Sequence, residues 1–296
     1  MLTGEFEILG FDDGFIDDEN HHTDSVFFLT FNPYEIGTLM PHTMEQPVLI
    51  NGDARTGIIL FCDHATNHVP QGYDKLGLAN EHFEDHIAYD IGAEAVTRKI
   101  CELMGVAAVL GPVSRLLIDC NREEDRRSLV PRKSDGVIIP ANQDLTTAVI
   151  EARKQAYYYP FHDACEQLVA DHVAEGLVPL VLGVHSYTPT MNGEDRAWHA
   201  GFLWNKDPRL AQALIGLLER ETDLIIGDNL PYSGADLYYT MQRHGADHGL
   251  PQTTLEIRQD LVDDEAKTTE WAALIADLLD ECLSRKDLVQ RKYYSK

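Results

Sequence analysis

Two histidines, His64 and His185, each stand just after a short apolar run of the sequence. A neutral imidazole binds Zn²⁺ through one ring nitrogen when an acceptor holds the other. Asn67, three positions after His64, offers a carbonyl oxygen as a further ligand, and Asp63 offers either a ligand or an acceptor for one. A single histidine at the end of a strand is more often structural. The pair on two separate runs is what predicts a shared metal site.

The polar segment Asp119-Cys120-Asn121-Arg122 follows the apolar run 116–118, and Arg115 stands just before that run. Arginine holds a carboxylate through two parallel hydrogen bonds, and an asparagine amide adds a donor. We therefore expect Arg115, Asn121 and Arg122 to bind a substrate carboxylate. The alternative is that Arg122 pairs only with the acids at 123–125.

Glu256 lies in the apolar run 253–257 and is the candidate general base. A carboxylate on a buried strand is costly and has a raised pKa unless a cation compensates. That setting suits a base that takes a proton from an attacking water. The alternative is a structural ion pair with Arg258, which alternation along a strand places on the same face.

Two further places attract attention. His86 and Asp90 are four residues apart and share a face if that segment is helical. The segment 227–234 is rich in turn-forming residues, and its Tyr232, with the later His244, is expected to cover a pocket.

Short apolar runs alternate with helical patterns through the body of the chain. The strands are expected at 58–61, 106–110, 116–118, 180–184, 224–226 and 253–257. The helices are expected at 91–104 (closed by Gly105), at 145–175 with a bend near Pro160, from Asp207-Pro208 onward, and at 264–284. This alternation predicts an α/β fold with a largely parallel sheet. Ligands of such sheets bind at the carboxyl ends of strands, where His64, Asp119–Arg122, His185 and Glu256 are expected to meet.

The composition restricts the partners. The net charge of −25 argues against nucleic acid and anionic membranes as partners, so an anionic substrate needs local cations. No apolar run is long enough to span a membrane, and no signal peptide is seen. Five scattered cysteines without a CxxC pair favour a reducing cytoplasm and no disulfide framework. Residues 1–46 read as an acidic extension before a domain at 47–296, and a homo-oligomer is left open.

The chain resembles the N-formylglutamate amidohydrolase family from about residue 57 to 280. The resemblance is carried by CDHATNHVP (62–70), HIAYDIGA (86–93), SRLLIDCNR (114–122), VHSYTP (184–189), GDNLPYSG (227–234) and LEIRQDLV (255–262). It implies a three-layer α/β/α fold with a mostly parallel mixed central sheet, similar to zinc carboxypeptidases and aspartoacylases. It also implies hydrolysis of N-formyl-L-glutamate to formate and glutamate, and a link to histidine degradation.

The resemblance to zinc carboxypeptidases extends to particular residues. Their HSY, Asn-Arg and Glu-x-Arg sequences correspond to 185–187, 121–122 and 256–258. Their HxxE pair is only half matched, because Asn67 stands where the ligand carboxylate is expected; Asp63 and Asp90 are the alternatives. Leu230 stands where similar sequences tend to have a glutamate, which predicts a changed specificity if that glutamate contacts the substrate.

Together these features predict a zinc-dependent amidohydrolase acting on a small N-acyl amino acid. Zn²⁺ is expected on His64, His185 and either Asn67 or an acid, with Glu256 as the base. Substrate binding is assigned to Arg115, Asn121, Arg122, Ser186, Tyr232, His244 and Arg258. Asp63, His86 and Asp90 are expected to surround and hold the residues that bind the metal. Two alternatives stay open: a deacylase of another N-acyl amino acid, and a metal-depleted, non-catalytic binder of small carboxylates.

Overall fold

The structure is a computed structural model that describes residues 45–191 and 193–294. These residues belong to one compact unit. The proposed acidic extension, 1–46, lies outside the described residues except for its last two positions, so its boundary stays a prediction. Within the described part, no helix is both long and apolar enough to cross a membrane.

A seven-stranded sheet forms the centre, in the order β1-β3-β2-β6-β11-β9-β10. Its strands are β1 (Val48–Ile50), β2 (Ile58–Cys62), β3 (Ala107–Leu110), β6 (Leu180–Tyr187), β9 (Ala200–Leu203), β10 (Ile226–Asp228) and β11 (Gln252–Arg258). β1 runs antiparallel to β3 and β9 antiparallel to β11, while the other four pairs are parallel. The expected mostly parallel mixed sheet is confirmed.

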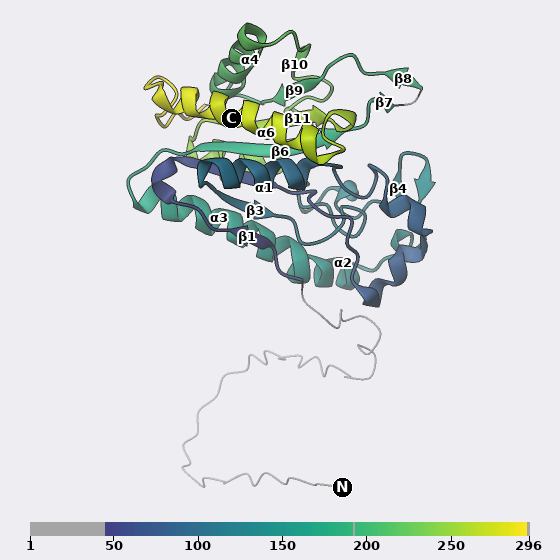
Figure 1. The fold of residues 1–296 in the computed structure, drawn as a ribbon. Coiled ribbons are helices and arrows are strands. Elements are labelled where there is room, and N and C mark those ends of the chain that lie inside the picture. Colours follow the sequence, from purple (N-terminus) through teal and green to yellow (C-terminus); the bar gives the residue numbers. More distant parts are fainter. Residues whose placement is uncertain (1–44, 192, 295–296) are drawn as a thin grey trace, which may run out of the picture. The chain divides into compact units, whose positions relative to one another are not determined.

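Helices cover both faces of this sheet (Figure 1). On one face lie α1 (Ala93–Met104), α4 (Arg209–Glu221) and α6 (Glu265–Ser284), with α1 and α6 side by side. On the other lie α3 (Tyr159–Ala174) and α5 (Tyr239–His244), and α2 (Thr147–Arg153) leads into α3 through a π-helical turn, Lys154–Tyr158. This arrangement confirms the three-layer α/β/α fold.

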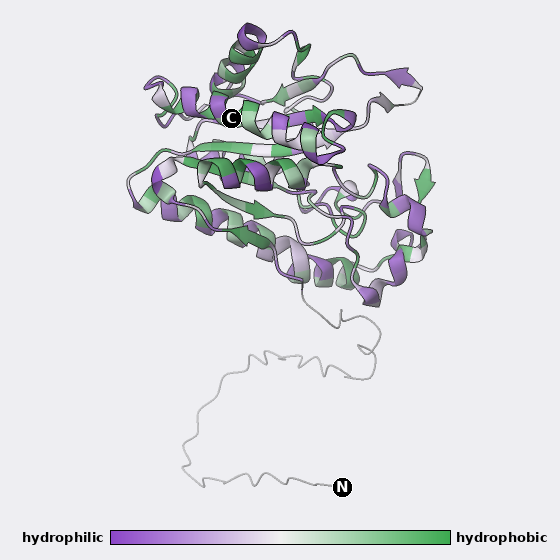
Figure 2. Cartoon of the chain, in the orientation of Figure 1, coloured by the Kyte–Doolittle hydropathy of each residue, from purple (hydrophilic) through white to green (hydrophobic). Residues whose placement is uncertain are grey.

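Two hydrophobic clusters, one on each face, hold the layers together. Every residue of β2 is buried, and successive side chains of a strand point to opposite faces. Ile58, Leu60 and Cys62 belong to the cluster under α1, α4 and α6, whereas Ile59 and Phe61 belong to the cluster under α3. Figure 2 shows the central strands, β6 among them, in the colours of hydrophobic residues and the helices in both colours. Burial on both faces explains why these strands read as continuous apolar runs.

Most of the predicted helices are confirmed, with their ends where the signals place them. α1 ends at Met104 and is capped by Gly105, which has a left-handed φ of 67° and whose N–H bonds to the carbonyl of Cys101. α6 begins after Asp264, whose side chain accepts from the N–H of Lys267. The predicted bend near Pro160 is the π-helical turn that joins α2 to α3.

The predicted strand at 116–118 is wrong. These residues form a turn, in which the N–H of Leu117 bonds to the carbonyl of Ser114 and the N–H of Leu116 to the Ser114 hydroxyl. Leu116 and Leu117 are fully buried. The apolar run therefore indicates that residues 116–118 are buried. Their backbone hydrogen bonds are local, and the segment is not part of a sheet.

Two small hairpins stand apart from the central sheet. β4 (Lys133–Ser134) pairs with β5 (Val137–Ile138), and β7 (Thr190–Met191) pairs with β8 (Glu194–Asp195). The second hairpin follows directly after β6 and brings Met191 to the edge of the sheet where the site lies.

Candidate metal centre and active site

Three buried side chains from separate elements converge at the carboxyl ends of β2 and β6. His64 comes two residues after β2, His185 lies within β6, and Asp90 precedes α1. β2 and β6 are parallel neighbours, so their ends meet at the same edge of the sheet. Both histidines were predicted here, although His185 lies inside its strand rather than after it, because β6 extends beyond its apolar run to Tyr187.

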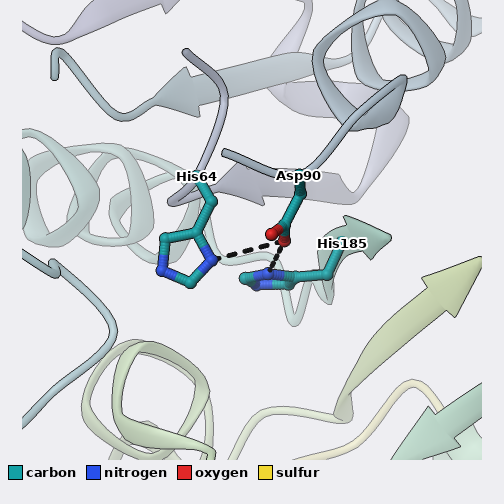
Figure 3. Close-up of side chains that lie close together, drawn as sticks. All are labelled: His64, Asp90 and His185. Atoms are coloured by element: carbon teal, nitrogen blue, oxygen red, sulfur yellow. Dashed lines mark hydrogen bonds and ion pairs between the residues drawn. The ribbon is translucent and has the colours of Figure 1, made fainter. Parts of the chain in front are cut away.

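The two imidazoles point at one carboxylate oxygen (Figure 3). Oδ2 of Asp90 is 2.7 Å from Nδ1 of His185 and 3.3 Å from Nδ1 of His64. The three ligand atoms lie within 4.8 Å of one another. A carboxylate oxygen and an unprotonated ring nitrogen are both acceptors, so this arrangement calls for positive charge between them, either protons or a metal cation.

Each histidine is held from behind by a second buried carboxylate. Nε2 of His64 is 2.7 Å from Oδ1 of Asp119, and Nε2 of His185 is 3.2 Å from Oδ2 of Asp63. A carboxylate on the far ring nitrogen fixes the tautomer of a metal-binding histidine and makes it more basic. Two imidazole nitrogens and one carboxylate oxygen, each imidazole so anchored, are a donor set that suits Zn²⁺.

The electrostatics of this group follow from burial and close charges. Burial opposes ionisation of His185, but its contacts with Asp63 and Asp90 outweigh this and raise its pKa well above the usual value. Burial likewise disfavours the Asp119 carboxylate, yet Arg122, His64 and Arg115 hold the pKa of Asp119 well below its usual value. The Asp119 carboxylate is thus ionised and places a negative charge beside His64.

Asn67 does not join this group, which corrects the prediction that it supplies the third ligand. Its amide N–H donates to the carbonyl of Phe83 at 2.7 Å, and it does not line the chamber described below. Phe83 is the last residue of the short helix Asn80–Phe83, so this hydrogen bond turns the amide of Asn67 toward that helix. Asp90, named above only as an alternative, stands in the third position.

Glu256 lies on β11 directly beside His185 on β6, since the two residues are partners in the parallel register. It is buried, and burial raises its pKa from 4.5 to about 7, while the positive charge of His185 opposes the shift. The alternative, an ion pair with Arg258, does not occur. Arg258 binds Asp260 at 2.8 Å and the carbonyl of Arg196.

Two arginines line the same chamber. Nη1 of Arg115 is 3.1 Å from Oδ1 of Asp90, and both Arg115 and Arg122 place an Nη2 3.5 Å from Oδ2 of Asp119. Arg122 also donates to the carbonyl of Asn121 at 2.8 Å. The backbone N–H of Asn121 donates to Asp119, so the segment after Asp119 is tied to the histidine group. The guanidinium of Arg122 points to this site rather than pairing with the acids at 123–125.

These side chains enclose a chamber of about 240 Å³, which we call the inner chamber. Ten residues predicted from the sequence line it: His64, His86, Asp90, Arg115, Asn121, Arg122, His185, Ser186, Tyr232 and Glu256. Four others were not predicted as site residues, namely Tyr187, Thr188, Met191 and Leu237. Tyr187 and Thr188 belong to the VHSYTP motif but were given no role, and nothing in the local sequence of Met191 and Leu237 marks them as walls of a pocket.

Neither His244 nor Arg258, both assigned to substrate binding from the sequence, lines the inner chamber. His244 faces inward from α5 and is fully buried, with Nε2 2.9 Å from Nδ1 of His162 and Nδ1 3.1 Å from Glu166. Leu230 is also outside the chamber, with 39% of its surface exposed.

Three of the predicted residues have partners that define their part in the site. The hydroxyl of Ser186 donates to the carbonyl of Ile91 at 2.7 Å and thereby ties β6 to the turn that carries Asp90. The hydroxyl of Tyr232 accepts from Arg196 at 3.0 Å. His86 contacts Asp85 and lies 3.3 Å from Asp135; its segment is a turn, not the helix considered from its spacing to Asp90.

Solved structures share this fold. Gene product Atu2144 from Agrobacterium tumefaciens is 35% identical, with a TM-score of 0.78 over 81% of this chain and 95% of its own. The N-formylglutamate amidohydrolase from Ralstonia eutropha JMP134 is 17% identical, with a TM-score of 0.64 over 80% of this chain and 96% of its own, a likeness of fold alone. A comparison with curated proteins gives no match. The architecture is therefore one that an amidohydrolase uses.

The sequence model of the N-formylglutamate amidohydrolase family matches residues 56–262. That range contains the two histidines, Asp90, both arginines and Glu256. The chain belongs to the N-formylglutamate amidohydrolase family, as its motifs predicted, and so to a family of amide hydrolases.

Proposed function

We propose that this protein is a zinc-dependent hydrolase of the amide in N-formyl-L-glutamate or a closely similar N-acyl amino acid. One observation carries the proposal: His64, Asp90 and His185 converge beside the buried Glu256, and each histidine is backed by its own carboxylate. The family supports the amide as the bond that is cleaved. The metal and the substrate are the parts that experiment must test.

His64, Asp90 and His185 would hold the ion, whose chemistry is to polarise the amide carbonyl and make water a better nucleophile. Glu256 takes a proton from the water whose oxygen adds to the carbonyl carbon. The carbon–nitrogen bond then breaks, and Glu256 returns the proton to the departing nitrogen, so that an acid and an amine form. A carboxyl with a pKa near 7 can both accept and return a proton at neutral pH.

Arg115 and Arg122 supply the local positive charge that an anionic substrate needs on a chain with a net charge of −25. Both are shared with Asp119, at 3.5 Å in each case, which is longer than a strong ion pair. Their remaining N–H donors suit a substrate carboxylate, which two parallel hydrogen bonds would orient. Asn121 lines the same chamber.

The test is formate release from N-formyl-L-glutamate, measured on protein as purified, after chelation, and after Zn²⁺ is restored. We expect activity that chelation abolishes and zinc recovers. A panel of N-formyl, N-acetyl and longer N-acyl amino acids then identifies the acyl group. Absence of activity on every member of the panel at full metal occupancy would falsify the proposal.

The alternative of a metal-depleted binder rested on Asn67 in place of a ligand carboxylate. Asp90 offers a carboxylate beside the two histidines, and this argues against the metal-depleted binder. A location in the cytoplasm stays part of the proposal; all five cysteines are free and buried, in keeping with a reducing compartment.

A further inference from the structure

A second chamber, of about 330 Å³, adjoins the inner chamber, and we call it the outer chamber. Asn121, Arg122 and Leu237 line both. Since the same three side chains form walls of both spaces, the two chambers meet at Asn121, Arg122 and Leu237.

The walls of the outer chamber are polar. Ser128, Asn205 and Gln242 bring hydroxyl and amide groups to it, and Tyr239 brings a phenol. Its charges balance, since the basic Arg122 and Arg126 are matched by Glu123 and Asp236 on the same walls. Such a lining offers hydrogen bonds to amide N–H and C=O groups and gives little attraction to an aliphatic chain.

The volumes of the two chambers bear on whether the substrate is a single N-acyl amino acid or a longer N-acyl peptide. The inner chamber, at about 240 Å³, is below the range of roughly 300–1,000 Å³ typical of sites for larger small molecules, and it suits a single N-acyl amino acid. The outer chamber is larger and adds room for a second residue. A substrate limited to one amino acid would leave this polar space to water.

We propose that the outer chamber is a substrate subsite, and that the preferred substrate is an N-acyl dipeptide whose second residue occupies it. This proposal rests on the proposed function. The acyl amide lies beside Glu256, the acidic side chain of the first residue meets Arg122, and the peptide bond continues past Leu237. The reaction is unchanged: water adds to the acyl carbon, the N-acyl amide breaks, and the dipeptide leaves with a free amino group.

The experiment compares formate release from N-formyl-L-glutamate and from N-formyl-L-glutamyl-L-alanine, using the zinc-loaded full chain. For the wild type we expect kcat/KM for the dipeptide to be at least ~10-fold higher, since one or two good hydrogen bonds supply that much. Ala235→Trp should remove this preference, because Ala235 is exposed, lines the outer chamber and lies outside the inner one. Turnover of N-formyl-L-glutamate should stay within about twofold.

Two further variants distinguish a blocked outer chamber from a misfolded protein. Ser128→Trp fills the outer chamber from another segment and should act as Ala235→Trp does. Ala141→Trp changes an exposed alanine that lines neither chamber, and it should leave the preference intact. A wild type that prefers the single amino acid, or tryptophan variants that slow both substrates equally, would overturn the subsite while leaving the proposed function standing. Failure to cleave either substrate would overturn both.

Discussion

Replacement of Glu256 by glutamine keeps the volume of a buried side chain and removes its charge. Burial raises the pKa of this carboxyl from 4.5 to about 7. A shift of one pKa unit corresponds to about 1.36 kcal/mol, so the ionised side chain costs the folded protein about 3 kcal/mol when no metal is present.

The sign follows from proton linkage. A carboxyl with a higher pKa in the folded state binds its proton more tightly there, so the folded protein loses stability as pH rises from about 4.5 to 7. Above pH 7 the loss is complete and constant. Glutamine does not titrate, so Glu256→Gln should lack this part of the pH dependence. Between pH 5 and pH 8 the metal-free variant should gain about 2.5 kcal/mol relative to the wild type, since the wild type has already lost part of the effect at pH 5.

The assay is urea unfolding of chelator-treated protein at pH 5 and pH 8, for the wild type and the variant. Glu270→Gln serves as the control, because it makes the same change on an exposed position of α6. We expect the control to follow the wild type at both values of pH. Equal pH dependence in Glu256→Gln and the wild type would refute the claim that burial keeps Glu256 protonated near neutrality.

Three further predictions concern activity and metal binding. Glu256→Gln should lower kcat by at least ~10² with zinc content unchanged, as measured by formate release and metal analysis; full activity would make Glu256 structural. Asp63→Asn and Asp119→Asn, each behind one histidine, should weaken zinc binding by roughly 10–100-fold in a chelator competition, and unchanged affinity would contradict their anchoring role. Arg122→Lys keeps the charge but loses the paired donors, so KM should rise about tenfold at constant kcat; an unchanged KM would show that the carboxylate binds elsewhere.

Local sequence was sufficient for most of the elements and for three central residues. β2 and the first part of β6 are buried on both faces and apolar, so the polar residues that follow these runs stood out, and Glu256 stood out as a carboxylate on the buried strand β11. His64, His185 and Glu256 were found in this way. Parallel strands place their carboxyl ends at one edge, which is why residues far apart in sequence could be expected to meet there.

The resemblance to known motifs narrowed the chemistry further, but it carried an assumption about local spacing. The family pair led to Asn67, within three residues of His64, with Asp63 and Asp90 as alternatives, and the side chain that groups with the two histidines is Asp90. The apolar run 116–118 was wrongly predicted as a strand for a similar reason. An apolar run indicates burial, but it does not show whether the backbone hydrogen bonds belong to a sheet.

Only the tertiary structure decided which side chains face one another. His64 meets Asp90 across 26 residues and Asp119 across 55, and His185 meets Asp90 across 95. Such pairings depend on strand order and on the path of the connecting turns, whereas a periodic pattern records only which side of an element is buried. For the same reason the sequence could nominate His244 but could not show that α5 turns it into the core, away from the site that His64 and His185 form.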